Sequence, residues 1–260
     1  MYEKRGETMK KLTAFLLSAG ILFSLTACSS SSKVEDNALD AFEKVVNKIV
    51  EMKTATYKAS VDTETEDGEK VNLTLSGAYL ADSANPSFSA VLKMTSGTES
   101  YDNFMEFYLK DNMLYMSMLG MKQKGPMTDM KEAGIIPDVD EETFQLDKEA
   151  IKPYLKTAKL DGSKLTLEFD SGKFNQLVKD NEDVTNSLTN GAETTYKKAL
   201  LEIELKDDFA SKILLDMEAE QKSDTETKKI DGTITLEFTD INTKKEITFP
   251  DFSNYTEAQQ

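Results

Sequence analysis

Residues 54–77 read TATYKASVDTETEDGEKVNLTLSG, two runs in which apolar and polar side chains alternate on either side of Asp67-Gly68. A repeat of two residues puts alternate side chains on opposite faces of a strand, and Asp-Gly is a favoured turn between paired strands. The stretch therefore predicts a β-hairpin with one apolar face. The side chains expected on that face are Ala55, Tyr57, Ala59 and Val61, followed by Val71, Leu73 and Leu75.

The same alternation recurs on both sides of a less regular middle section, residues 119–160. Antiparallel sheets commonly keep one apolar face on a core and the other face in water. We therefore expect these runs to form one antiparallel, half-solvated sheet. The predicted strands are residues 88–94, 105–109, 113–118 (after a turn at Asp111-Asn112), 165–169, 201–205, 213–219 and 234–238, with Ile247 and Phe249 closing the chain.

Three segments repeat instead at intervals of three and four residues, which is typical of a helix with one buried face. The first has a cap at Asp36 or Asn37 and carries Leu39, Phe42, Val45, Val46, Ile49 and Val50. The second is predicted from Asp147 to Lys159, where Pro153 should kink or shorten it. The third is predicted around residues 174–178.

Together these elements predict an α+β domain. Its strongly curved antiparallel sheet would cup the inserted helices and follow the N-terminal helix. Nothing in the composition divides the chain, so we expect a single domain over residues 36–256. The alternative is a flat sandwich of two sheets. The inserted helices argue against it, because a sandwich already covers both apolar faces with strands.

The beginning of the chain has the pattern of an exported lipoprotein. Met9 is followed by Lys10-Lys11, by an apolar run from Leu12 to Leu25, and by Thr26-Ala27-Cys28. That run is shorter than the roughly 20 residues that cross a bilayer, so it predicts a cleavable signal over residues 1–27. We expect Cys28 to carry diacylglycerol, with or without an N-acyl group. Residues 28–35 would then tether the domain to the extracytoplasmic face of the cell membrane.

The composition argues against several classes of function. The chain has 31 Lys and Arg against 47 Asp and Glu, a net charge of −16, which disfavours binding to nucleic acid. It has no histidine, and its one cysteine is Cys28, so common proton shuttles, disulfides and transition-metal ligands are lacking. No nucleophile elbow or phosphate loop is present. We expect a monomer that is not an enzyme and has no cofactor besides the acyl groups.

One acidic stretch has the spacing of a calcium loop. Asp138, Asp140, Glu142 and Glu149 occupy positions 1, 3, 5 and 12, but Thr143 stands where the loop needs a glycine for a left-handed turn. We interpret the stretch as an acidic loop followed by a capped helix, and predict no metal site.

Methionines are concentrated between residues 105 and 130. Their flexible, polarizable side chains suit a cavity that holds flexible chains, and they also suit the seam between a sheet and its helices. Met116 and Met118 decide between the two interpretations, because one requires an open groove and the other a sealed core.

In this order of features the chain resembles the LolA-like bacterial lipoproteins, and in particular their Gram-positive members. The resemblance rests on the Cys28 motif, the helix to Met52, the strand beginning Thr54-Ala55-Thr56-Tyr57, the hairpin of residues 108–116 and the closing segment of residues 247–255. Relatives include periplasmic lipoprotein carriers and mycobacterial glycolipid carriers, which share an unclosed β-barrel around a hydrophobic cavity.

The resemblance implies that the anchored domain binds or carries a lipid or another hydrophobic ligand in an apolar groove. The alternative is a cell-surface interaction protein, or a sensor or accessory subunit, with a filled core and an acidic outer face. The candidate groove residues are Val71, Leu73, Leu75, Leu92, Met94, Met116 and Met118.

Overall fold

The computed structural model describes residues 33–65, 68, 70–81, 85–128, 147–180, 193–222, 227–244 and 246–257. They form one sheet of 13 strands in the order β1-β8-β9-β10-β11-β12-β2-β3-β4-β5-β6-β7-β13. The strands are β1 (Lys33–Val34), β2 (Thr54–Thr65), β3 (Lys70–Leu80), β4 (Ser87–Ser96), β5 (Glu99–Lys110), β6 (Met113–Met118), β7 (Met121–Pro126), β8 (Leu155–Asp161), β9 (Lys164–Phe169), β10 (Glu193–Lys206), β11 (Phe209–Lys222), β12 (Thr227–Thr239) and β13 (Thr256–Glu257).

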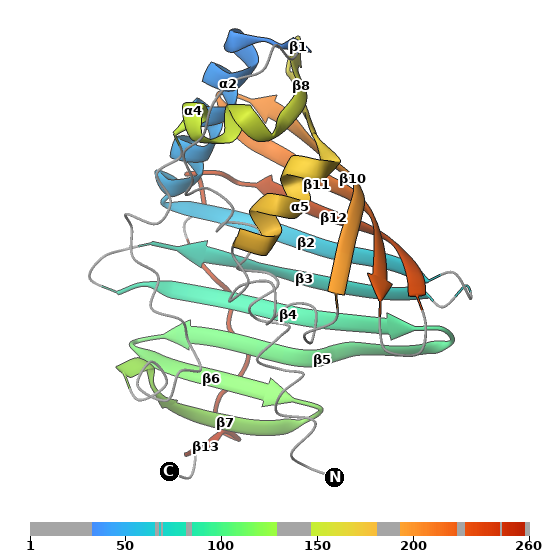
Figure 1. Cartoon of the computed structure of the whole chain (residues 1–260). Helices are drawn as coiled ribbons and strands as arrows, with labels where there is room; N and C mark the ends of the chain where they lie inside the picture. Colours follow the sequence, from blue (N-terminus) through green and yellow to red (C-terminus); the bar gives the residue numbers. More distant parts are fainter. Residues whose placement is uncertain are drawn as a thin grey trace.

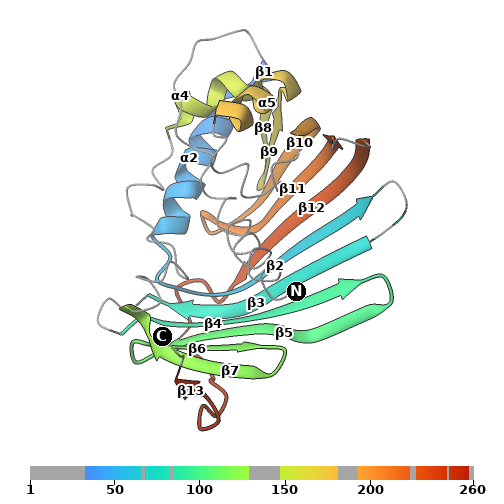
Figure 2. The same cartoon turned by 60° about the horizontal axis from the view of Figure 1, so that its bottom comes forward.

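The sheet is strongly curved and open. Figures 1 and 2 show β1 and β8 at one end and β7 and β13 at the other, and these two ends do not pair. All neighbouring strands are antiparallel except the two-residue pairs β1–β8 and β7–β13. The predicted curved, unclosed sheet is therefore present in the described part of the chain, and the flat-sandwich alternative is wrong.

Tight turns keep consecutive strands paired. Asp111 and Asn112 both have positive φ angles, 52° and 59°, and they join β5 to β6 as predicted. Asp207 and Asp208, with φ angles of 51° and 67°, join β10 to β11 in the same way. Turns of this left-handed type match the right-handed twist of the strands they connect.

Helices cover one half of the concave face (Figure 2). They are α2 (Asp36–Val50), α4 (Lys148–Ile151) with a following 3-10 turn η2 (Lys152–Tyr154), and α5 (Ser171–Asp180). Helix α2 contacts β8, β9 and β11, and α5 contacts β10. The largest fully buried side chains of the core come from α2 and from the strands beneath it: Leu39, Phe42, Val45, Leu165, Leu167 and Ile203.

The asparagine side chain of Asn175 fixes α5 to the sheet. Its amide nitrogen donates to the carbonyl of Tyr196 and its oxygen accepts from the amide of Tyr196, both at 2.7 Å. Tyr196 lies at a register shift in β10, where the ladder is interrupted. The side chain of Asn175 therefore supplies the hydrogen bonds that a neighbouring strand would otherwise make.

Helix α2 matches its prediction, except at the cap. Glu35, and not Asp36 or Asn37, has the extended backbone of a cap residue, and its carbonyl accepts from the amides of Ala38 and Leu39. The predicted cap is therefore wrong by one or two residues.

The helix predicted from Asp147 to Lys159 is wrong in its second half. Asp147 does cap a helix, since its side chain accepts from the amide of Glu149, but the helical turns end at Tyr154 and strand β8 begins at Leu155. Pro153 lies in the last of these turns, which agrees with the predicted shortening.

Two further differences concern strands. Strand β7 had not been predicted, because its sequence MKQKGP alternates weakly and ends in glycine and proline. Ile247 and Phe249, predicted to be in a strand, lie in an irregular segment that crosses the outside of the sheet. Their alternation reflects one side chain facing the sheet and the next facing water, without a paired neighbour.

Candidate functional site

The strand register brings all seven predicted groove residues onto one face. Leu75 lies opposite Leu92, and Leu73 lies opposite Met94. Met118 lies opposite Met105, which in turn lies opposite Leu92. Met116 lies opposite Phe107, two residues from Met105 along β5. Directly opposed residues of neighbouring strands point to the same side of a sheet, and Val71 lies two residues from Leu73. The seven side chains therefore share a face.

That face is the concave one. Val61, which lies opposite Leu73, is followed across the sheet by Ile234, Leu215, Leu201 and Leu167. Leu167 is completely buried in the core beneath the helices. The groove residues therefore lie on the same face as the helical core, in the other half of the sheet.

No described helix covers this second half. Figure 1 shows α2, α4 and α5 over the strands at the β8 end, while β3 to β7 carry no described helix on this face. Leu92 is buried, whereas the other six groove residues are half-buried. Met116 and Met118 are thus neither sealed like the core nor open like a surface. We call these seven residues, together with the apolar residues that share their face on β12 and on β2 to β6, the concave apolar face.

Several further residues of this face are not among the predicted groove residues. Only the register shows that they share this face with the predicted groove residues, because alternation gives a face within one strand and not the partner strand. They are Tyr57, Tyr79, Phe88, Met105, Phe107, Leu114, Ile234, Leu236 and Phe238.

Near the end of β3, the concave apolar face contains a close approach of β2 and β3 to a backbone carbonyl of β4. The Tyr57 hydroxyl donates to the Ser89 carbonyl at 2.8 Å, and its ring stacks on Phe88 with centroids 6.1 Å apart. A Cβ atom on Gly77 would lie 1.8 Å from that carbonyl oxygen, so only glycine fits. Burial raises the pKa of Tyr57, which keeps its hydroxyl neutral and able to donate.

One end of this face has exposed apolar side chains. Among the described residues, the exposed large hydrophobic side chains are Tyr101, Leu119 and Met121, at 39%, 53% and 61% exposure. Phe104 connects them, since its ring meets that of Tyr101 and its carbonyl accepts from the amide of Leu119. We call Tyr101, Phe104, Leu119 and Met121 the apolar rim. Met121 lies opposite Met118, so the rim continues the concave apolar face.

The structure also contains a cavity of about 580 Å³, but it opens on the convex face. Of the residues on the concave side, only Tyr57 and Gly77 reach it. The seven predicted groove residues do not line it.

Other predicted features lie outside the described residues. These are Cys28 with its signal, residues 28–32 of the tether, and Asp138, Asp140 and Glu142 of the calcium-like stretch. Within the described ranges, no group of three acidic or cysteine side chains could hold a metal ion. No helix in those same ranges is long and apolar enough to cross a membrane.

Comparisons with known proteins give distant likenesses. No protein-family model and no curated protein matches the chain. Among solved structures, LprF from Mycobacterium bovis is 10% identical with a TM-score of 0.38, and the match covers 84% of this chain and 99% of that one. A LolA superfamily protein, NE2245 from Nitrosomonas europaea, is 10% identical with a TM-score of 0.26, covering 84% and 96%.

A third similar structure is a DUF1329 family protein from Desulfovibrio piger, 8% identical with a TM-score of 0.26 over 80% of this chain and 92% of that one. Likenesses at these scores carry no argument about this chain. The open, curved sheet with helices on part of its concave face is established by the register described above.

Proposed function

We propose that this chain is a non-enzymatic, membrane-anchored extracytoplasmic lipoprotein of the LolA-like kind. It holds a lipid or another hydrophobic ligand against its concave apolar face. The observation that carries the proposal is the position of the seven predicted side chains. They lie together, six of them half-buried, on the half of the sheet that no described helix covers.

Such a face is suited to an acyl chain for a physical reason. Each methylene exposed to water costs about 0.8 kcal/mol, so a chain of about 16 carbons costs roughly 13 kcal/mol to withdraw unaided from a bilayer. Contact with leucine, methionine and phenylalanine side chains offsets most of this cost without directional bonds. The methionines among them adapt to chains of different shape. No reactive side chain is needed for this task.

The apolar rim supports exchange of the ligand with a membrane. Its exposed side chains continue the concave apolar face to the end of β5, β6 and β7. Leu119 has a φ angle of +49°, in a turn where asparagine or glycine is normally favoured. A large apolar residue is kept there despite both strain and exposure, which is expected where the residue contacts something apolar.

Native mass spectrometry of a soluble form beginning at Ser29 tests the proposal. We expect co-purifying lipid in the wild-type form, and its loss from Met94→Glu, which places a charge on the concave apolar face. Thr95→Glu is the matched control, because Thr95 is the next residue, is also half-buried, and points to the opposite face. The filled-core alternative predicts no lipid in any form. Equal loss from both variants would also contradict the proposal.

The anchor has its own test. In cells, Cys28→Ser should accumulate as an uncleaved precursor that is not labelled by a fatty-acid probe, whereas the wild-type chain is cleaved and labelled. A normally processed and labelled variant would refute the lipid anchor without affecting the proposal about the concave apolar face.

A further inference from the structure

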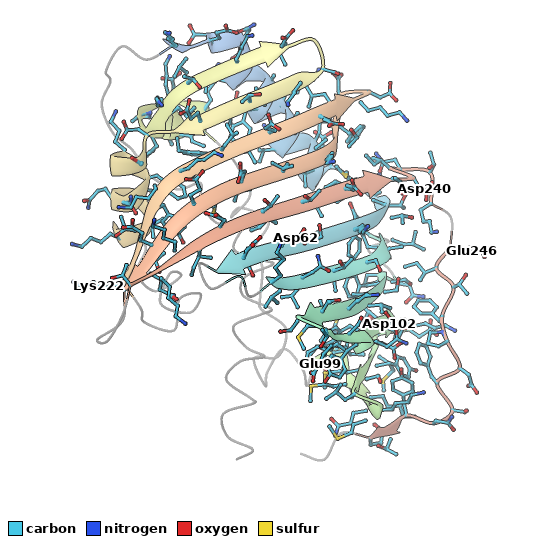
Figure 3. The ribbon with its side chains drawn as sticks, turned by 90° about the vertical axis from the view of Figure 1, so that its right-hand side faces the viewer. Asp62, Glu99, Asp102, Lys222, Asp240 and Glu246 are labelled. Atoms are coloured by element: carbon cyan, nitrogen blue, oxygen red, sulfur yellow. The ribbon has the colours of Figure 1, made fainter. Side chains whose placement is uncertain are left out.

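The end of the chain forms a strap across the outside of the sheet. We define the C-terminal strap as residues 241–244 and 246–257. In Figure 3, where Asp240 and Glu246 are labelled, it leaves the end of β12 and runs beside the convex face to β13. It therefore crosses the side of the sheet opposite to the concave apolar face.

Hydrogen bonds fix the first end of the strap. The Asn242 amide donates to the Thr54 carbonyl, and the Asn242 side chain accepts from the amide of Lys53, both at 2.8 Å. Just before the strap, the carboxylate of Asp240 accepts from the Thr56 hydroxyl at 2.8 Å. These contacts hold the start of the strap against β2.

Aromatic packing fixes the other end. The Phe252 ring stacks on Tyr115 with centroids 3.7 Å apart, and the Tyr255 ring meets both of them edge-on. Tyr108 contacts Phe249 and Phe252 and is buried. Strand β13 then pairs with β7. With both ends fixed, the middle of the strap spans the sheet.

The cavity of about 580 Å³ lies beneath this middle part. Its floor consists of two rows of side chains across β12, β2, β3 and β4, and Tyr57 and Gly77 complete the floor. Lys244, Ile247 and Thr248 of the strap cover it. The first row is Thr239, Thr56, Ala78 and Ser89, and the second is Glu237, Lys58, Ser76 and Val91.

The floor is held in a specific shape. The Ser89 hydroxyl, in place of a backbone carbonyl, accepts from the amide of Ala78 at 3.1 Å. The freed Ser89 carbonyl accepts from Tyr57 on the other face. The pairing of β3 with β4 is thus modified directly under the cavity, and Gly77 is the residue that permits it.

Two lysines without carboxylate partners face this cavity. Among the described residues no carboxylate oxygen lies within 4.0 Å of the ammonium of Lys58 or Lys244, although acidic residues outnumber basic ones in the chain. Glu237, which lies opposite Lys58, is instead 3.6 Å from the ammonium of Lys212. Positive charge with hydroxyl groups beside it therefore remains available inside the cavity.

We propose that this cavity binds a small anion, a carboxylate or a phosphate attached to a short apolar group. Lys58 and Lys244 contact the anionic group, and the hydroxyls of Ser76 and Thr248 donate hydrogen bonds to it. Val91 and Ile247 contact the apolar part. The volume falls within the roughly 300–1,000 Å³ of small-molecule sites. The anion comes either from a free small molecule or from a lipid headgroup.

Isothermal titration of the full chain in neutral detergent tests this site with hexyl phosphate and hexanoate. We expect both probes to bind, and we expect added salt to weaken the binding. Lys58→Met or Lys244→Met should lower the affinity about tenfold or more. Glu237→Gln should tighten it several-fold, because it removes the negative charge beside Lys58. Lys70→Met is the control, since Lys70 lies at the far end of β3 and pairs with Glu64 at 3.0 Å.

The source of the anion is distinguished by adding phosphatidylglycerol to the micelles. If phosphatidylglycerol competes with hexyl phosphate, the natural anion is a lipid headgroup. If it does not compete, the anion is a free small molecule. The proposal is overturned if neither probe binds, or if binding is unchanged in both lysine variants while their thermal unfolding is normal. Met94→Glu should leave this binding intact, so failure of this site and failure of the concave apolar face can be told apart.

Discussion

Gly77 is a glycine for a steric reason that its strand position does not reveal. In a strand interior alanine is normally favoured over glycine by roughly 0.5–1 kcal/mol. Here a Cβ would lie 1.8 Å from the Ser89 carbonyl oxygen and 2.8 Å from the Tyr57 hydroxyl oxygen. We expect Gly77→Ala to destabilise the fold by roughly 1–3 kcal/mol, measured by urea unfolding.

Gly232→Ala is the matched control for Gly77. Gly232 also lies within a strand, but a Cβ there would come no closer than 3.7 Å to Thr63, an ordinary contact. We expect this variant to be as stable as wild type or slightly more stable. A similar loss of stability in both variants would show that the close approach at Ser89 is not the cause.

We expect Leu119 to lower the stability of the fold, because its backbone is in the left-handed region, and to contribute to ligand transfer at the apolar rim. A non-glycine residue in the left-handed region costs about 1–2 kcal/mol, and asparagine tolerates that region better than leucine. Leu119→Asn should therefore raise the thermal stability by about 1 kcal/mol and slow the transfer of ligand to vesicles. Met121→Asn, which is exposed but lies in β7, should slow transfer without stabilising the fold. Unchanged transfer in both variants contradicts a role for the rim.

At the scale of elements, two ion pairs connect α2 to α4 and its following turn. Asp36 accepts from Lys152 at 2.9 Å, and Asp40 accepts from Lys148. The hydrogen bond and charge of Lys152 lower the pKa of Asp36 below its ordinary 3.8, and the same contact raises the pKa of Lys152 above 10.5. The stabilisation by this pair is therefore present between these values. It is lost as the pH falls through the pKa of Asp36 or rises through that of Lys152.

A pH series of thermal unfolding checks this connection. Between pH 7 and pH 3 the wild-type chain should lose stability. The Asp36→Asn variant should lose less, because it already lacks the ion pair between residue 36 and Lys152. Asp231→Asn removes a charge from an exposed strand residue and should follow the wild-type curve. The effect should be small, since both partners are solvent-exposed. If the Asp36→Asn curve parallels the wild-type curve, the connection contributes nothing.

Strand β8 shows why some elements could not be predicted from the sequence. Its register shifts between Leu155 and Thr157, so the buried residues Leu155 and Ala158 are three apart and mimic helical spacing. In strands without such a shift within the apolar run, such as β2 and β3, the alternation was sufficient to predict both the strand and its inner face. A bulge changes the spacing of inward residues without leaving a distinct sequence pattern.

For the whole molecule, the sequence predicted which side chains share a face within a strand, but not which strands are neighbours. Leu75 and Met118 lie on one face because Leu92 and Met105 lie directly opposite one another between them, on β4 and β5. Only long-range strand pairing determines this register. The convex cavity was missed for the same reason. Lys58 and Lys244 are distant in sequence, and each alone reads as an ordinary surface lysine. Their proximity depends on β12 pairing with β2 and on the course of the strap.

The two halves of the sheet should differ in stability. Strands β8 to β11 pack against the helices through the buried core, while β3 to β7 have no described helix on their concave face. Regions with fewer buried apolar contacts open at lower free energy, so amide hydrogens of β5 to β7 should exchange faster than those of β9 and β10. Hydrogen-exchange mass spectrometry of the full chain measures this difference.

A ligand bound to the concave apolar face should slow exchange in β3 to β7 and leave β9 and β10 unchanged, because only the former lie beneath it. Met94→Glu should abolish that added protection, whereas Thr95→Glu should retain it. Uniform exchange across the sheet would mean that the uncovered half is stabilised as well as the helical half. The apolar face would then be core and not a binding surface. Added protection confined to β12, β2, β3 and β4 would instead locate the ligand at the convex cavity.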